Sequence, residues 1–301
     1  MESETHFVFL IQGRHSELSH FEFLKNAESK IITLSWDTSE INFLFQDHHY
    51  YLPESTWAEG RNFLLAKALE LYPNLEYVIF MDGDLQIASG NIQEFLEFLK
   101  FYKPALGLPL SNQLKETSRF LSTSRVQTQV SFDQVMQAYS RKAIQDRICL
   151  PYVTELDHLS WWYSCEINQY LTIKYYEKET LQCNSLTVNN THHTMPQTKT
   201  SDSKYIGGIT KAGIRECKKV IVKKFGKQEI LVGTLFQPRC LPKPMNMDIR
   251  ARKLLENERM WTVRALLRKI YFIQALAYAK VLKLLFGKKY PVQKSVASDE
   301  H

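Results

Sequence analysis

Short apolar runs without polar alternation constrain the fold of this chain most. They lie at 6–13, 30–37 and 76–81, and each has the length of a single strand. Runs of this kind are typical of strands that are buried on both faces of a parallel sheet. The segments 16–27 and 60–72 lie between them, and the second is rich in strong helix formers and stops at Pro73. This alternation predicts an α/β domain with a mostly parallel central sheet flanked by helices.

The rest of the first two thirds is harder to assign. We expect, in chain order, a strand at 42–45, a helix at 91–102, a strand at 105–110, a polar loop at 111–130, a helix at 133–148, and a polar loop at 183–205 with a strand-like stretch at 185–188. No internal repeat and no long Gly/Ser or Pro linker precedes residue 205. The prediction is therefore a catalytic-type domain at 1–205 and a basic, largely helical region at 206–301.

Composition excludes several classes of protein. With 301 residues and 44% apolar residues the chain can bury a full core. Its five cysteines are widely spaced and never form a CxxC pair, which argues against a zinc ribbon and against a disulfide framework. The N-terminus lacks the basic and long apolar regions of a signal peptide. These features predict a cytoplasmic location.

Charge is distributed unevenly along the chain. Residues 1–210 hold 17 Lys plus Arg and 25 Asp plus Glu, whereas residues 211–290 hold 20 and 5. A polyanionic partner is therefore expected at the last third of the chain. We expect no nucleic acid, because the sequence has no zinc finger, no RRM-like aromatic signature and no basic-region zipper.

The triplet Asp82-Gly83-Asp84 directly follows the apolar run 76–81. Open α/β sheets bind ligands outside the carboxyl ends of their strands, so two carboxylates at this position suggest a site. Glycine between them allows a tight turn and close approach of a ligand. Carboxylate oxygens suit a hard divalent cation that keeps open positions for phosphate oxygens. An ordinary Asp-Gly turn is the structural alternative.

Together with Gly60-Arg61-Asn62 at a helix start, the stretch 77–85 resembles nucleotide-sugar-dependent glycosyltransferases of the GT-A fold. The resemblance covers about residues 6–200 and implies a Rossmann-like half that binds the nucleotide. It implies that Asp84 binds Mn²⁺ or Mg²⁺ and that Asp82 contacts the ribose or the metal. Arg61 and Asn62 would lie close to the nucleotide, with Arg61 on the phosphates. The alternative for an arginine in a first helical turn is a solvated side chain.

A second candidate region combines acidic and aromatic residues. Glu155 and Asp157 precede Trp161 and Trp162. Aromatic faces stack on sugar rings, and a neighbouring carboxylate can take the proton of an attacking hydroxyl. The region resembles the acceptor side of such enzymes, which implies Asp157 as the base, with Glu155 in reserve. Both tryptophans could equally belong to the core.

Two adjacent histidines, His192 and His193, follow the strand-like stretch 185–188. Many GT-A enzymes complete the metal site with a histidine late in the domain, and this segment resembles that position. The resemblance implies His193 as the further ligand and His192 as the alternative. A solvated histidine remains the other interpretation.

The segment 256–289 contains helix formers throughout, and its basic and apolar residues fall on opposite arcs of a helix. Its apolar part is too short to span a bilayer. It suits a helix that lies on an anionic membrane surface, or one that packs on the catalytic domain. The first alternative predicts peripheral contact with the inner face of a membrane.

These observations predict a metal-dependent glycosyltransferase that moves a sugar from a nucleotide-diphosphate donor to a glycan or glycolipid acceptor, in cell-surface polysaccharide synthesis. Two other functions remain open. One is a non-catalytic carbohydrate- or membrane-binding scaffold with the same fold. The other is a sugar-phosphate nucleotidyltransferase, which usually carries a glycine-rich basic loop that residues 6–14 lack.

Overall fold

The computed structural model describes residues 5–39, 44–112, 124–129, 132–191, 211–225 and 244–247. The chain divides into two compact units, Met1–Met247 and Asp248–His301, and all the described residues belong to the first. Two described elements beyond residue 205 therefore fall in the first unit, although the sequence assigned them to the C-terminal region. The predicted helix at 256–289 lies outside the described residues.

The elements of the first unit alternate as an α/β protein requires. In chain order they are β1 (Phe7–Gly13), α1 (His15–Leu18), a 3-10 helix (Phe21–Leu24), β2 (Ser29–Ser35), β3 (His48–Tyr51), α2 (Trp57–Leu71), β4 (Tyr77–Asp82), β5 (Leu85–Ser89), α3 (Ile92–Tyr102), β6 (Leu106–Ser111), β7 (Ser124–Thr128), β8 (Met136–Ser140), α5 (Arg141–Gln145), α6 (Trp161–Tyr176), β9 (Thr180–Asn190), α7 (Lys211–Phe225) and β10 (Pro244–Met247).

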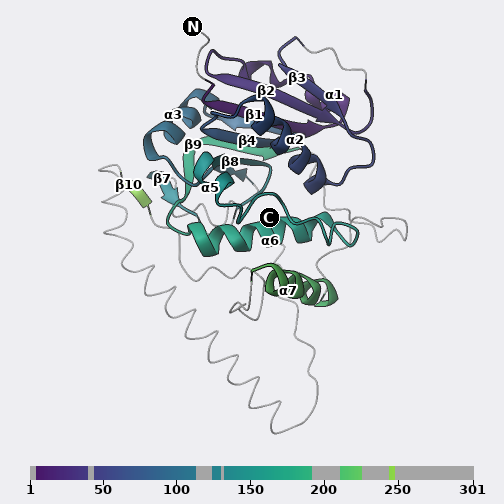
Figure 1. Cartoon of the computed structure of the whole chain (residues 1–301). Helices are drawn as coiled ribbons and strands as arrows, with labels where there is room; N and C mark the ends of the chain where they lie inside the picture. Colours follow the sequence, from purple (N-terminus) through teal and green to yellow (C-terminus); the bar gives the residue numbers. More distant parts are fainter. Residues whose placement is uncertain are drawn as a thin grey trace, which may run out of the picture. The chain divides into compact units, whose positions relative to one another are not determined.

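Within the described residues, ten strands form one sheet in the order β10-β7-β9-β6-β8-β4-β1-β2-β3, with β5 paired to β9. The strands β4, β1, β2 and β3 are parallel to one another, and so are β6 and β9. Between these two parallel groups runs β8, antiparallel to both β4 and β6. The start of β8 therefore lies at the same edge of the sheet as the carboxyl ends of β4 and β6. Figure 1 shows the sheet with its helices.

The sheet is buried on both faces, as its apolar runs predict. Alternate residues of β1 enter different core clusters: Val8 and Leu10 pack with side chains of α2 and α6, whereas Phe7 and Phe9 pack with side chains of α1 and α3. α7 lies against α6, so it belongs to the same helix layer as α2 and α6 (Figure 1).

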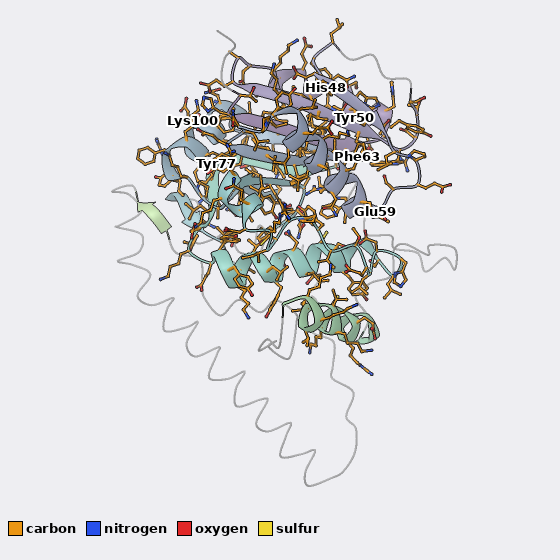
Figure 2. All side chains as sticks on the ribbon, viewed as in Figure 1. His48, Tyr50, Glu59, Phe63, Tyr77 and Lys100 are labelled. Carbon is orange, nitrogen blue, oxygen red and sulfur yellow. The ribbon has the colours of Figure 1, made fainter. Side chains whose placement is uncertain are left out.

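The helix α2 begins with a reciprocal cap. Thr56 accepts a hydrogen bond from the backbone of Glu59, and the Glu59 side chain accepts one from the backbone of Thr56. Farther along the helix, Phe63 meets Tyr50 of β3 edge to face, with ring centroids 5.3 Å apart (Figure 2). The Gln12 side chain of β1 donates to the Trp57 carbonyl at 3.1 Å, so the first turn of α2 lies over the carboxyl end of β1.

Most predicted elements of the first half are confirmed, namely β1, β2, α2, β4, α3 and β6. Four expectations are wrong. The predicted loop 111–130 contains the strand β7. The third strand is His48–Tyr51, whereas the described part of the predicted strand 42–45 is a turn. The predicted helix 133–148 contains β8 and only a short helix, α5. The predicted loop 183–205 begins inside β9, an eleven-residue strand.

Candidate functional site

The carboxyl ends of β1 and β4 approach each other unusually closely. Gln12 pairs with Asp82 in the sheet, and the Gly83 backbone N–H donates to the Gln12 carbonyl at 2.7 Å. A Cβ atom added to Gly13 would lie 2.8 Å from the Gly83 Cα, and one added to Gly83 would lie 2.8 Å from the Gly13 Cα. The two glycines therefore let the Asp82-Gly83-Asp84 turn sit directly against the end of the neighbouring strand.

Asp82 is held by groups from α2. Its Oδ1 atom accepts from Arg61 Nη2 at 2.8 Å and from the Trp57 indole N–H at 3.0 Å. The Asp82 side chain is 20% exposed. Within the described part of the chain its Oδ2 atom accepts no hydrogen bond, so one carboxylate oxygen stays available for a ligand.

Arg61 is fully buried, and the expectation that it could be solvated is wrong. Besides Asp82, its guanidinium donates to Gln137, to the Tyr152 hydroxyl and to the Gln134 carbonyl. Its Cζ atom lies 4.0 Å from the centroid of the Trp57 ring. The guanidinium is thus engaged by the protein, and its contact with donor phosphates stays a prediction.

Burial and pairing act in opposite directions on this ion pair. Burial opposes the charge of Arg61, but the attraction of Asp82 raises the arginine pKa. Burial also raises the pKa of Asp82 to about 6, against the pull of Arg61 and with a further push from Asp84. Asp82 is therefore a weaker acid than an ordinary aspartate, and Arg61 offsets part of the negative charge that Asp82 and Asp84 place at the strand end.

The strand β9 reaches the same turn. Its pairing with β5 sets Asn190 opposite Leu85, directly after Asp84. The backbone N–H of Thr191 then donates to the Asp84 carbonyl at 3.2 Å, and its hydroxyl donates to the same oxygen at 2.9 Å. His192 follows Thr191 in the sequence. His192 and His193 themselves lie outside the described residues.

The donor set at this turn fits a divalent cation. Asp82 has one carboxylate oxygen that accepts no hydrogen bond from the described residues, Asp84 is partly exposed, and hard cations prefer such oxygen ligands. In the described ranges, no group of three or more His, Cys, Asp or Glu side chains is arranged to hold a metal ion. A third protein ligand would have to come from elsewhere in the chain.

Asp157 is buried, at 4% exposure, between two helix starts. The hydroxyl of Thr56, which caps α2, donates to its Oδ2 atom, and the hydroxyl of Ser164 in α6 donates to its Oδ1 atom. Burial raises the pKa of Asp157, while these two hydrogen bonds oppose the rise. The carboxylate therefore stabilises the junction of α2 and α6, and its raised pKa also suits a group that accepts a proton.

Glu155 has a different environment from Asp157. It is exposed and forms an ion pair with Lys224 of α7, with 2.5 Å between Oε1 and Nζ. Although partial burial opposes it, the hydrogen bond from Lys224 lowers the pKa of Glu155. Trp161 and Trp162 are the first residues of α6. Their proposed stacking on an acceptor sugar stays a prediction.

Asn62 binds the backbone of another segment. Its amide N–H donates to the Tyr152 carbonyl at 2.9 Å, and its amide oxygen accepts from the Tyr152 N–H at 2.7 Å. This reciprocal pair ties α2 to the chain that leads toward α6. Contact of Asn62 with a nucleotide stays a prediction.

Sequence reasoning missed several residues of this site: Trp57, Gln137, Tyr152 and Thr191. Gln137 and Tyr152 follow Arg61 by 76 and 91 positions, so no local pattern connects them with it. Thr191 had a signal, because it stands directly before the histidines that the sequence singled out.

No protein-family model and no curated protein matches the sequence. Among solved structures, S. aureus TarS 1–349 is 15% identical, with a TM-score of 0.40 and 60% of each chain covered. The same fragment in complex with UDP is 14% identical, with a TM-score of 0.46, covering 73% of this chain and 65% of that one. GalNAc-T7 with UDP, GalNAc and Mn²⁺ is 9% identical, with a TM-score of 0.46 and coverages of 63% and 44%. The chain thus spans less than two thirds of each of these chains, and likeness at this level assigns no activity.

Proposed function

We propose that this chain is a metal-dependent glycosyltransferase of the GT-A type, which moves a sugar from a nucleotide-diphosphate donor to a glycan or glycolipid acceptor. The observation that carries the proposal is the pair of hydrogen bonds from Thr191 to the Asp84 carbonyl. They support a site in which Asp82 and Asp84 meet the segment that leads to His192 and His193. Carboxylates at a strand end with an adjoining histidine suit Mn²⁺ or Mg²⁺ and a diphosphate.

The proposed chemistry needs little covalent participation from the protein. Asp84, Asp82 and His193, or His192, would hold a divalent cation, which when bound would supply charge stabilisation to the departing diphosphate. Arg61 holds Asp82 in one orientation, because its guanidinium is fixed by Gln137 and Tyr152. Asp82 can then keep its geometry while charge develops on the donor oxygens.

On the acceptor side, Asp157 is the proposed base. Its raised pKa favours acceptance of a proton from the attacking hydroxyl at a carboxylate oxygen. To do so it must exchange the hydroxyl of Thr56 or Ser164 for that of the acceptor. Glu155 stays the reserve, but its ion pair with Lys224 makes it the weaker base.

The chain is further proposed to act in cell-surface polysaccharide synthesis at the inner face of a membrane, in the cytoplasm, with residues 256–289 as a peripheral contact. The basic balance of the last third supports this location. Among the described helices, none combines the length and the apolar character needed to cross a bilayer. Separation of soluble and membrane fractions, with and without high salt, tests this part of the proposal.

The enzyme proposal is tested by measuring hydrolysis and transfer with a panel of nucleotide sugars in the presence of Mn²⁺. Asp84→Ala is expected to abolish turnover while the fold persists, because the variant loses a metal ligand. Glu97→Gln, which neutralises an exposed carboxylate on α3, is the matched control and should keep full activity. Full activity in Asp84→Ala would exclude the metal-dependent mechanism.

Two alternatives predict different outcomes of the same measurements. A carbohydrate- or membrane-binding scaffold would bind no nucleotide in a metal-dependent way. A sugar-phosphate nucleotidyltransferase would release pyrophosphate from a nucleoside triphosphate and a sugar phosphate, and it would leave nucleotide sugars intact in the absence of pyrophosphate.

A further inference from the structure

The helix α7 carries a concentration of positive charge that the proposed reaction does not use. Its fifteen residues contain six Lys or Arg and a single acidic residue, Glu216. Residues 1–210 hold 17 Lys plus Arg against 25 Asp plus Glu, so this helix stands out from the part of the chain that precedes it. Its orientation decides whether that charge is available to a partner.

One face of α7 is fixed against the protein. Cys217 and Ile221 are fully buried and belong to the same core cluster as the buried side chains of α6. Gly213 lies so close to Tyr163 that an added Cβ atom would be 1.8 Å from the tyrosine hydroxyl oxygen. At the other end of the helix, Lys224 forms its ion pair with Glu155. These contacts prevent rotation of α7 about its axis.

The opposite face points to solvent. Arg215, Lys219 and Lys223 are exposed, Lys218 is partly exposed, and Val222 is 43% exposed among them. Lys219 is paired with Glu216 at 2.8 Å. In the part of the chain that the structure describes, Arg215, Lys218 and Lys223 form no ion pair. The fixed orientation of the helix thus presents together one apolar side chain and three cations that form no ion pair with the described residues.

We propose that this basic face of α7, formed by Arg215, Lys218, Lys219, Val222 and Lys223, binds the surface of an anionic lipid bilayer. Charge complementarity selects a polyanionic partner. The exposed valine among the cations favours a bilayer over a nucleic acid, because an apolar side chain can enter the headgroup boundary but gains nothing beside a phosphate backbone. The proposed face contains none of the residues 256–289 that the sequence assigns to a membrane contact.

The ion pair between Lys224 and Glu155 gives this surface a functional consequence, which rests on the proposed transfer reaction. Glu155 stands two residues before Asp157, the proposed base. Lys224 lies on the protein-facing side of α7, so a bilayer bound to the opposite face would lie about 10 Å from Glu155, one helix diameter away. That arrangement suits an acceptor whose sugar is attached to a membrane lipid.

The test is sedimentation of the full chain with vesicles of phosphatidylglycerol and phosphatidylcholine in equal amounts, and with phosphatidylcholine alone. The triple variant Arg215→Gln, Lys218→Gln, Lys223→Gln is expected to bind the anionic vesicles on the order of 100-fold more weakly at low ionic strength, because each cation contributes roughly a factor of five. Neither form should bind phosphatidylcholine alone with comparable strength. Since no sugar transfer is measured, failure of this proposal is distinguishable from failure of the proposed enzyme activity.

The matched control removes three cations from other surfaces, Lys25→Gln, Lys103→Gln, Lys142→Gln, and should change vesicle binding less than twofold. Circular dichroism of both variants checks that the fold is retained. A single substitution, Val222→Ser, keeps every charge and should weaken binding by a few-fold. Three results would overturn the proposal. The α7 triple variant could bind the vesicles as well as wild type, or the control could lose as much binding as the α7 variant. The α7 variant could also lose binding to an RNA oligonucleotide while it keeps vesicle binding.

Discussion

Arg61 Nη2 lies 2.8 Å from Asp82 Oδ1 and forms a buried ion pair between the second turn of α2 and the end of β4. The arginine side chain is 1% exposed and makes further hydrogen bonds to Gln137 and Tyr152. An aspartate held in this way cannot swing away from the strand end. Arg61 is therefore a positioning residue for Asp82, which the proposed site needs beside Asp84.

Replacement of Arg61 by methionine should be strongly destabilising. The substitution leaves the Asp82 carboxylate largely buried without its cation, and breaking a buried pair in this way costs about 3–5 kcal/mol. Urea denaturation followed by circular dichroism measures the loss. Arg141→Met is the control, because that arginine is exposed at the start of α5, and it should change the stability by less than about 0.5 kcal/mol. Equal losses in the two variants would show that the ion pair contributes nothing specific.

Gly83→Ala should separate the ends of β1 and β4. The added methyl group would lie 2.8 Å from the Gly13 Cα, so one backbone must shift, and overpacking of this kind costs about 1–3 kcal/mol. Gly13→Ala meets the same contact from the other side. The double variant should therefore lose less stability than the sum of the single variants, as thermal denaturation can measure. Strict additivity would contradict the account of this contact.

The parallel half of the fold could be predicted because its signal is local. The runs at β1, β2 and β4 are apolar throughout, and the helix formers of α2 end at a proline. The region around β8 misleads because Met136–Ser140 contains residues that tolerate a helix, yet the strand fills the gap between β4 and β6. Tertiary pairing, which no short window contains, decided its structure.

The candidate site likewise contains one part that could be predicted from local sequence and another that depends on tertiary contacts. The Asp82-Gly83-Asp84 turn could be identified from its position after a strand. The burial of Arg61 could not, because the groups that surround it come from β8 and from the segment before α6. The same holds for Asp157, whose hydroxyl partners lie in α2 and α6.

Ser164→Ala should move the acidic limb of the transfer rate toward higher pH. The Ser164 hydroxyl stabilises the Asp157 carboxylate, so its removal raises the pKa of Asp157 further above the ordinary value. A base acts only when deprotonated, and the rate then falls at a higher pH as the solution is acidified. A pH profile of kcat/KM measures the shift.

A second buried hydroxyl of α6 provides the control for that profile. Thr172 donates to the Cys149 sulfur and makes no hydrogen bond to Asp157. Thr172→Val should leave the position of the acidic limb unchanged, whatever it does to stability. A profile that is identical in wild type and Ser164→Ala would mean that Asp157 is not the base.

Substitution of a histidine that follows β9 should change the Mn²⁺ dependence of the activity, whereas substitution of a histidine elsewhere should not. His193→Ala is expected to raise the Mn²⁺ concentration needed for half-maximal activity by more than about tenfold, because a ligand is lost. His192→Ala should show this effect instead if that residue is the ligand. His6→Ala is the control, since His6 lies before the amino end of β1, at the opposite edge of the sheet. Unchanged metal dependence in both variants would remove the histidines from the site.

The central claim is that Asp82 and Asp84 bind a divalent cation that in turn binds a nucleoside diphosphate. Isothermal titration of the wild-type chain with uridine and guanosine diphosphates, with and without Mn²⁺, tests it most directly, with Asp84→Asn and Glu97→Gln measured in parallel. The account predicts that one of the two nucleotides binds wild type and Glu97→Gln in the presence of Mn²⁺, and binds more than about tenfold more weakly without the metal or in Asp84→Asn. Nucleotide binding that is indifferent to Mn²⁺ and to the Asp84 substitution, or no binding at all, would contradict it.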